Sequence, residues 1–280
     1  MLVYVDDLLV VGELSLVQQG KQQLLAQFPC KDMGEAGVFV GFRIERNRGA
    51  CTLHISQPAH ALQLVEKVGL AAAKGRGVPL STAGQVTAAR GELDEEGKAR
   101  YKEAVGNLLY LRTHTRPDLA HVIGVLSRYM FNPTAEHWAL AKGAVRYLGG
   151  TSSSGISFGG EHAGRGLEGY VDSDFAGDSE DRKSTTGFVF LQVGGVVSWG
   201  SKKQSTVLSS TTEAEYIAAS VGVREAMWFQ KLGRDVLGWG KVAATAAGLA
   251  AGSAPVQLFT DSTSALSLIS NNVAGASTST

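Results

Sequence analysis

The order of apolar runs after residue 165 constrains the fold of this 280-residue chain more than any other feature. Three short runs predict a meander of three strands: 167–171, 187–193 and 196–201. A tight turn is expected at 194–195, because two glycines stand there. A long helical pattern follows at 211–237, then a strand at 256–260 and a helix at 262–270. The order β-β-β-α-β-α predicts an α/β unit, a mixed sheet with helices packed on it.

The preceding residues predict a unit of mixed helices and hairpins, of the α+β class. Short apolar strands are expected in two hairpins: 1–4 with 8–11, and 38–46 with 50–55. Amphipathic patterns predict five helices: 14–28, 58–68, 101–112, 117–131 and 134–147. Thr134 is the expected N-cap of the last of them. Residues 71–98 indicate a linker or excursion, residues 149–155 (GGTSSSG) a hinge, and residues 238–255 an Ala/Gly-rich excursion.

The charge balance excludes a global attraction to nucleic acid. Lysine and arginine together number 26, as do aspartate and glutamate, so binding would depend on local patches. The best patch contains Arg182, Lys183, Lys202 and Lys203, which could contact phosphates or form a solvated hairpin surface. The hydroxyl of Ser210 and its neighbours could contact phosphate near a helix start, although capping alone would explain them.

Cysteine content and hydropathy favour an intracellular protein that is not secreted. The two cysteines have no CxxC partner, and the opening MLVYVDDLLVVG lacks the basic region of a signal peptide. No apolar run reaches about 18 residues, so no membrane span is expected.

The first group of acids is Asp6 and Asp7, which lie between two apolar strands. Adjacent acids in this position fit an ordinary polar turn, because aspartate is a good turn residue. They also fit an oxygen-ligand site for Mg²⁺, which takes one or two carboxylates together with substrate phosphates.

The second group is Asp172 at a strand end, Glu215 near a helix start and Asp261 at a later strand end. If the two strands are neighbours, all three carboxylates converge, and divalent ions must then offset their repulsion. Two such ions would activate water and stabilise the leaving oxygen in phosphodiester cleavage. The alternative is three unrelated surface acids.

Two choices arise within this group. Glu213 and Glu215 point about 200° apart on a helix, and Ser210 with Glu213 fits a capping box. Glu215 shares its face with small residues suited to packing on a sheet, so it is the better ligand candidate. Asp172 and Asp174 face the same way on a strand, and physical chemistry alone leaves that choice open.

Long strings of the chain resemble the copia-type retrotransposon Pol family, over roughly 1–65 and 101–272. The most distinctive strings are YVDDLLVVG (4–12), VGNLLYLRTHTRPDLAHVIGVLSRYMFNPTAEHW (105–138), RYLGGTSSSGISF (146–158), GYVDSDFAGDSEDRKSTTGFVF (169–190) and VVSWGSKKQSTVLSSTTEAEYIAAS (196–220). The resemblance implies the C-terminal part of a reverse transcriptase followed by a ribonuclease H-like domain. The sheet of that domain is expected to have the strand order 3-2-1-4, with the Asp261 strand parallel to the Asp172 strand. The domains expected from it are 1–70 (end of the palm), 71–98 (linker), 99–150 (helical thumb or connection), 151–164 (hinge) and 165–280 (ribonuclease H-like).

The same resemblance implies roles for the acids. Asp6 and Asp7 would be palm acids, and Asp172, Glu215 and Asp261 would be ribonuclease H acids, with Asp172 preferred over Asp174. It implies Mg²⁺ or Mn²⁺ as cofactor, and an RNA–DNA hybrid, template RNA and DNA primer as partners. Its setting would be a cytoplasmic virus-like particle or the nucleus.

The chain also departs from the family pattern. It starts immediately before YVDD and ends soon after Asn272, so upstream Pol segments, the third palm acid and a fourth ribonuclease H acid are expected to be missing. We therefore expect no polymerase activity from this chain alone and weak hybrid cleavage. The alternatives are a truncated, inactive remnant and a module that binds nucleic acid without turnover.

Overall fold

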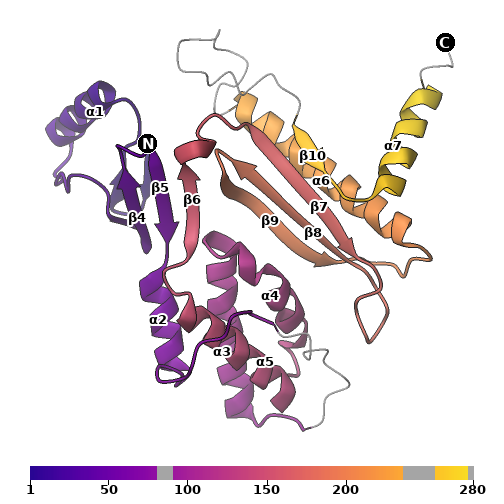
Figure 1. Cartoon of the computed structure of the whole chain (residues 1–280). Coiled ribbons are helices and arrows are strands. Elements are labelled where there is room, and N and C mark those ends of the chain that lie inside the picture. The colour runs from indigo at the N-terminus through magenta and orange to yellow at the C-terminus, as the bar shows by residue number, and fades with distance from the viewer. Residues whose placement is uncertain (81–90, 236–255, 277–280) are drawn as a thin grey trace.

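The computed structural model describes residues 1–80, 91–235 and 256–276 and mixes helices with sheets throughout (Figure 1). The chain begins with a hairpin in which β1 (Leu2–Tyr4) pairs with β2 (Asp7–Leu9), and α1 (Leu14–Gln27) follows. Both elements match the expected ones. None of the α1 residues is buried.

A second sheet contains four antiparallel strands in the order β3-β4-β5-β6. Their bounds are Val38–Phe39, Phe42–Asn47, Thr52–Ser56 and Gly155–Gly159. The single strand expected at 38–46 is broken, because Val40 and Gly41 have φ angles of 50° and 79° and turn the chain back.

Strand β6 corrects the expectation of a hinge at 151–164. The Gly/Ser-rich segment continues into a strand that pairs with β5, and Ile156 of β6 is buried opposite Ile55. Gly155 permits this approach, since a Cβ there would lie 2.1 Å from the carbonyl oxygen of Ile55. Periodicity misses such a strand because its partner is about 100 residues away in the sequence.

Helices below this sheet form the larger core (Figure 1). The elements are α2 (Pro58–Lys67), α3 (Glu95–His114), η1 (Pro117–Leu119), α4 (Ala120–Leu126), η2 (Ser127–Tyr129) and α5 (Ala135–Gly150). Tyr101, Leu108, Ile123 and Leu148 are fully buried here, and the Tyr101 hydroxyl donates to the carbonyl of Leu126 at 2.7 Å.

Helix boundaries in this unit differ from the expected ones at two places. α3 begins at Glu95 instead of residue 101, because the Asp94 side chain caps it by accepting from Gly97 N at 2.8 Å. The helix therefore includes residues 95–98 of the expected linker 71–98. Residues 81–90 of that linker lie outside the described residues. The segment 117–131 divides into η1, α4 and η2. The Thr134 cap of α5 is confirmed, and His137 completes its capping box.

The third sheet has the order β10-β7-β8-β9. Its strands are β7 (Leu167–Asp174), β8 (Thr185–Gln192), β9 (Gly195–Lys203) and β10 (Gln257–Phe259). β10 runs parallel to β7 and the other pairs are antiparallel, so the expected order 3-2-1-4 is confirmed. The β8–β9 turn is formed by Val193 and Gly194, with φ angles of 54° and 77°, one residue earlier than predicted.

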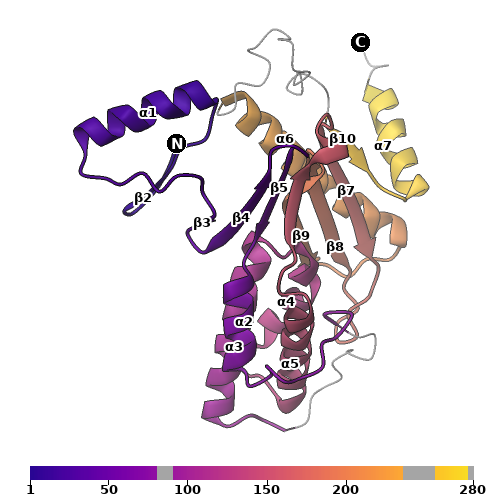
Figure 2. The same cartoon turned by 60° about the vertical axis from the view of Figure 1, so that its left-hand side comes forward.

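Helix α6 (Thr211–Asp235) covers one face of this sheet, and α7 (Thr263–Ala276) stands beside it (Figures 1 and 2). Small residues let α6 lie close: a Cβ on Gly222 would come within 2.5 Å of Val171 on β7. The excursion expected at 238–255 lies outside the described residues. The α6 face that meets the sheet is the face that presents Glu215.

Candidate metal centre

Three carboxylates from distant parts of the chain meet at the end of the third sheet. Asp172, Glu215 and Asp261 each offer an oxygen, and the three oxygens lie within 4.8 Å of one another. Among the described residues this is the only group of three or more histidine, cysteine, aspartate or glutamate side chains so arranged. The expected convergence is therefore present.

Parallel pairing of β10 with β7 brings the two aspartates together. Phe259 lies opposite Tyr170, so Asp172 and Asp261, each two residues further along the chain, reach the same end of the sheet. The Tyr170 and Phe259 rings stack with centroids 5.0 Å apart, which reinforces the register beside the acids. After Asp261, the Ser262 hydroxyl accepts from Ala265 N at 3.2 Å and caps α7.

Glu215 enters the site from the first turns of α6 and is buried, with 9% of its surface exposed. Burial raises the pKa of its carboxyl, and the negative charges of Asp172 and Asp261 raise it further. Its Oε2 atom has no hydrogen-bond partner among the described residues.

These observations fit a hard divalent cation. A buried carboxylate oxygen without a partner, beside two like charges, is costly unless a cation neutralises the group. The donor set contains only carboxylate oxygens, which suit Mg²⁺ and Mn²⁺ and do not suit soft metals. The residues present therefore fit the metal that the sequence predicts.

Glu213 faces away from the cluster, as the helix geometry predicts. Its Oε2 accepts from the backbone N and the hydroxyl of Ser209, both at 3.0 Å, and its own N donates to Ser210 Oγ at 3.2 Å. The bonds from Ser209 lower the pKa of Glu213. The capping role of Ser210 is confirmed, with the glutamate reaching back to Ser209 instead of Ser210.

The structure also separates Asp172 from Asp174. Asp172 belongs to the cluster and its Oδ1 accepts from Ser173 N at 2.7 Å. Asp174 lies one strand repeat further on and packs over Gly177, where a Cβ would come within 1.9 Å of Asp174 Oδ2. Asp172 is thus the ligand candidate.

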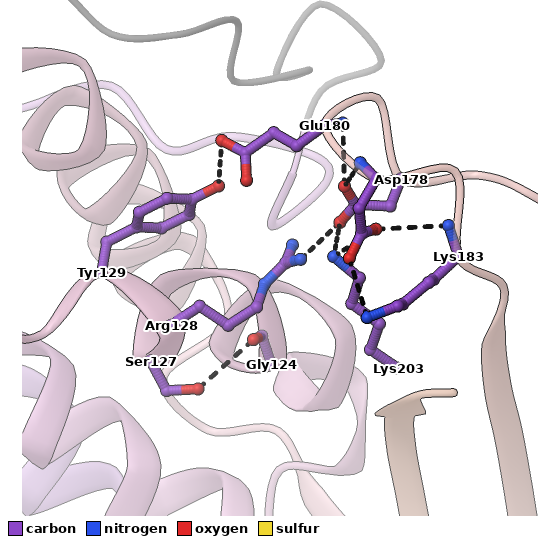
Figure 3. A network of polar contacts seen from close by, with 9 residues as sticks. Gly124, Ser127, Arg128, Tyr129, Asp178, Glu180, Lys183 and Lys203 are labelled. Carbon is purple, nitrogen blue, oxygen red and sulfur yellow. Dashed lines mark hydrogen bonds and ion pairs between the residues drawn. The ribbon is translucent and has the colours of Figure 1, made fainter. Parts of the chain in front are cut away.

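The predicted basic patch is partly neutralised within the chain (Figure 3). Lys203 pairs with Asp178 at 2.8 Å and with Asp181 at 2.7 Å, and Lys183 pairs with Asp181 at 3.3 Å. Arg182 and Lys202 are exposed and form no ion pair within the described residues. The prediction missed the two aspartates because it considered the cations without the acids of the same loop.

Asp178 is the centre of this network (Figure 3). It accepts from Lys203, from Arg128 on η2 and from the backbone N of Glu180, and 8% of its side chain is exposed. Burial opposes its ionisation, but the hydrogen bonds from Arg128 and Lys203 outweigh burial and hold its pKa far below the usual range. The Tyr129 hydroxyl also donates to Glu180 at 3.0 Å, so the β7–β8 loop is fixed to the helical unit at two points.

Asp6 and Asp7 lie at the exposed tip of the N-terminal hairpin, where Asp7 pairs with Tyr4. They belong to no group of three potential metal ligands within the described residues, and their metal role stays a prediction. Both cysteines are free and exposed. In the part of the chain that the structure describes, every helix is too short or too polar to cross a membrane.

Comparisons with known proteins give relatives over most of the chain. A retrovirus-related Pol polyprotein from transposon TNT 1-94 of Nicotiana tabacum is 41% identical over 239 residues, which are 82% of this chain and 18% of that protein. A putative transposon Ty5-1 protein of Saccharomyces cerevisiae is 31% identical over 80% of this chain and 72% of its own length. A protein named secreted RxLR effector protein 161 of Plasmopara viticola is 49% identical over 46% of this chain and 89% of its own length.

The chain thus spans less than a fifth of the length of the tobacco Pol polyprotein that it matches. No family model and no solved structure matches it.

Proposed function

We propose, from the premise that this chain belongs to the family of retrovirus-related Pol polyproteins of transposons, that its third sheet with α6 and α7 is a metal-dependent nuclease of the ribonuclease H type. Its substrate would be the RNA strand of an RNA–DNA hybrid, the intermediate made when element RNA is copied into DNA. No specific observation favours the two alternatives, an inactive remnant and a module that binds nucleic acid without turnover.

The observation that supports this proposal most is the meeting of Asp172, Glu215 and Asp261 within 4.8 Å. Three elements separated in sequence deliver one carboxylate each, and the topology that does so is the order expected for a ribonuclease H sheet. Three acids collected by chance on a surface would not include one that is nine-tenths buried and has an unpartnered oxygen.

Asp172, Glu215 and Asp261 would hold Mg²⁺ or Mn²⁺. When bound, such an ion lowers the pKa of an attacking water and stabilises the leaving oxygen of a phosphodiester. The protein's own contribution is positional. Asp172 is oriented by the backbone N of Ser173, and Glu215 is held against the sheet by the small-residue face of α6. The exposed side chains of Arg182 and Lys202 remain candidates for contacts to hybrid phosphates.

Family membership also suggests that Asp6 and Asp7 belong to a nucleotidyltransferase site, acting on template RNA and a DNA primer, that other parts of a longer Pol protein would complete. Upstream Pol segments would then be partners of this chain, inside the cell.

The experiment is cleavage of a labelled RNA–DNA hybrid by the purified chain, in Mg²⁺, in Mn²⁺ and in EDTA. Cleavage of the RNA strand should require a divalent ion and should be lost in Asp172→Asn and Asp261→Asn. Matched duplex DNA should stay intact. Mn²⁺ binding, followed by electron paramagnetic resonance, gives a readout independent of turnover. Cleavage or Mn²⁺ binding that persists unchanged in Asp172→Asn would refute the proposal.

A further inference from the structure

A layer of buried polar side chains lies beside the carboxylate cluster, between the third sheet and the first turns of α6. Its members are each at most 9% exposed: Ser173, Ser184, Thr186, Gln204 and Glu215. Polar groups buried at this level are costly unless they are hydrogen-bonded. Each member of the layer that is not a candidate metal ligand therefore raises the question of a role beyond packing.

Gln204, which follows β9 and is 7% exposed, bridges a strand and a helix. Its Nε2 donates to Thr186 Oγ1 on β8 at 3.0 Å and to the carbonyl oxygen of Ala214 on α6 at 3.1 Å. A carbonyl oxygen only accepts, so the amide orientation is fixed, with nitrogen toward α6. Its backbone N donates to Ser184 O at 2.8 Å, which holds the residue at the end of the sheet.

The helix end of this bridge is the peptide group that precedes Glu215. The carbonyl of Ala214 and the backbone N of Glu215 belong to one planar unit. A side chain that grips this carbonyl therefore fixes the point from which the Glu215 side chain starts. Ala214 is fully buried, so water does not compete for the same oxygen.

The strand end of the bridge lies beside Asp172. Thr186 stands opposite Ser173 in the β7–β8 register, and Asp172 stands opposite Gly187, the next residue. The backbone N of Ser173 donates to Asp172 Oδ1 at 2.7 Å. Gln204 thus links the strand pair that contains Asp172 to the helix that contains Glu215.

We infer that Gln204 is a positioning residue that sets the spacing between the Asp172 and Glu215 carboxylates. The inference rests on the proposed metal-dependent function, because that spacing matters only where both carboxylates hold one cation. Residues that orient metal ligands commonly change metal affinity by about 10- to 100-fold when replaced.

The test replaces Gln204 by methionine, which keeps the volume and removes both donated bonds. Gln192→Met is the matched control: Gln192 is on the same sheet and stands at the far end of β8 from the carboxylates, and its buried Oε1 has no hydrogen-bond partner within the described part of the chain. Thr186→Val, a smaller change, removes the strand end of the bridge. Three properties of each variant are compared with wild type. They are the Mn²⁺ affinity, measured by electron paramagnetic resonance, the unfolding temperature, and the crystal structure without metal.

Gln204→Met should weaken Mn²⁺ binding about tenfold or more and move Glu215 away from Asp172, and Thr186→Val should do so less. Gln192→Met should leave the Mn²⁺ affinity and the position of Glu215 unchanged, even where it lowers the unfolding temperature. If Gln204→Met does not fold, the Mn²⁺ affinity and the Glu215 position in Thr186→Val test the inference instead. Mn²⁺ affinity and Glu215 position equal to wild type in the folded variant would overturn the inference. Wild-type chain that binds no Mn²⁺ would instead refute the proposed function, and the crystal structures would still decide whether Gln204 places Glu215.

Discussion

Glu213 and Glu215 show how two residues of the same type, two positions apart, acquire different environments. Glu215 is buried against the sheet beside two aspartates, and Glu213 is exposed and bonded to Ser209. The rotation of about 100° per helical residue accounts for the difference. Their substitutions should therefore have separate consequences.

We predict that Glu213→Gln lowers the free energy of unfolding only slightly, because glutamine can still accept the bonds from Ser209 and only the negative charge near the helix start is lost, and that it leaves Mn²⁺ affinity unchanged. Glu215→Gln should abolish Mn²⁺ binding and hybrid cleavage, since a ligand charge is lost. Urea unfolding and Mn²⁺ titration of both variants check this. The reverse pattern, with loss of binding only in Glu213→Gln, would disprove the assignment of Glu215.

Residue-level prediction from sequence succeeded where helical rotation or strand alternation decides a direction. The face of Glu215 and the exclusion of Glu213 follow from the helical period of 3.6 residues, and the cap at Thr134 follows from the preference for threonine at the N-cap. It failed where a partner is distant, and it left the choice open where two positions are equivalent. The pairing of Lys203 with Asp178 depends on how a loop closes, and the choice between Asp172 and Asp174 depends on the neighbouring strand.

At the scale of elements, the β7–β8 loop is stabilised by charge. Two of its residues that are not glycine, Ala176 and Arg182, have φ angles of 50° and 56°. Such backbone conformations cost free energy and persist only where other contacts fix them. The contacts of Asp178 with Arg128 and Lys203 supply that constraint and attach the loop to η2 (Figure 3).

This arrangement predicts a pH dependence of stability. Because the pKa of Asp178 is lower in the folded protein than its usual value near 3.8, its contribution to stability is complete above about pH 4 and is lost as the pH falls further. Asp178→Asn should lose about 1–3 kcal/mol at neutral pH, because the buried Asp178 carboxylate is the charged partner of Arg128 and Lys203. The stability of the Asp178→Asn variant should change less between pH 4 and pH 2 than the stability of wild type.

Urea unfolding at several pH values measures this effect, with Glu96→Gln as a control at an exposed carboxylate of α3. A wild-type protein whose stability falls no more steeply than that of Asp178→Asn below pH 4 would show that the network does not stabilise the loop.

Element prediction was accurate for strands that pair with sequence neighbours and for long helices. The third sheet has the expected order because β7, β8 and β9 pair in a meander of consecutive strands, and the helix α6 between β9 and β10 allows β10 to pair in parallel with β7. β6 was missed because it is short, is rich in glycine and serine, and pairs with β5 across the whole helical unit. The early start of α3 was missed because its first turn contains charged residues and no apolar stripe.

At the scale of the whole molecule, the second and third sheets meet through β6 and β9 (Figure 1). Gly159 N of β6 donates to Val193 O in the β8–β9 turn at 2.9 Å, and Trp199 Nε1 of β9 donates to Arg112 O of helix α3 at 2.9 Å. The contact is tight at Gly195, where a Cβ would lie 2.2 Å from the Phe158 ring. The absence of a side chain at Gly195 therefore lets the two sheets touch.

We predict that Gly195→Ala lowers the free energy of unfolding by about 1–3 kcal/mol, the usual cost of an added methyl group in a packed contact. The φ angle of Gly195 is not in the left-handed region, so alanine meets the ring and no backbone strain. Gly164→Ala is the control, since nothing lies within 4 Å of a Cβ there.

Phe158→Leu should recover part of the loss when combined with Gly195→Ala, because it shortens the obstructing side chain. Urea unfolding of the four variants and wild type gives the coupling between positions 158 and 195, and strict additivity of the two single changes would mean that Phe158 is not the obstacle. Partial recovery would show that contact between β6 and β9, two strands on different sheets, limits which residues can stand at the start of β9.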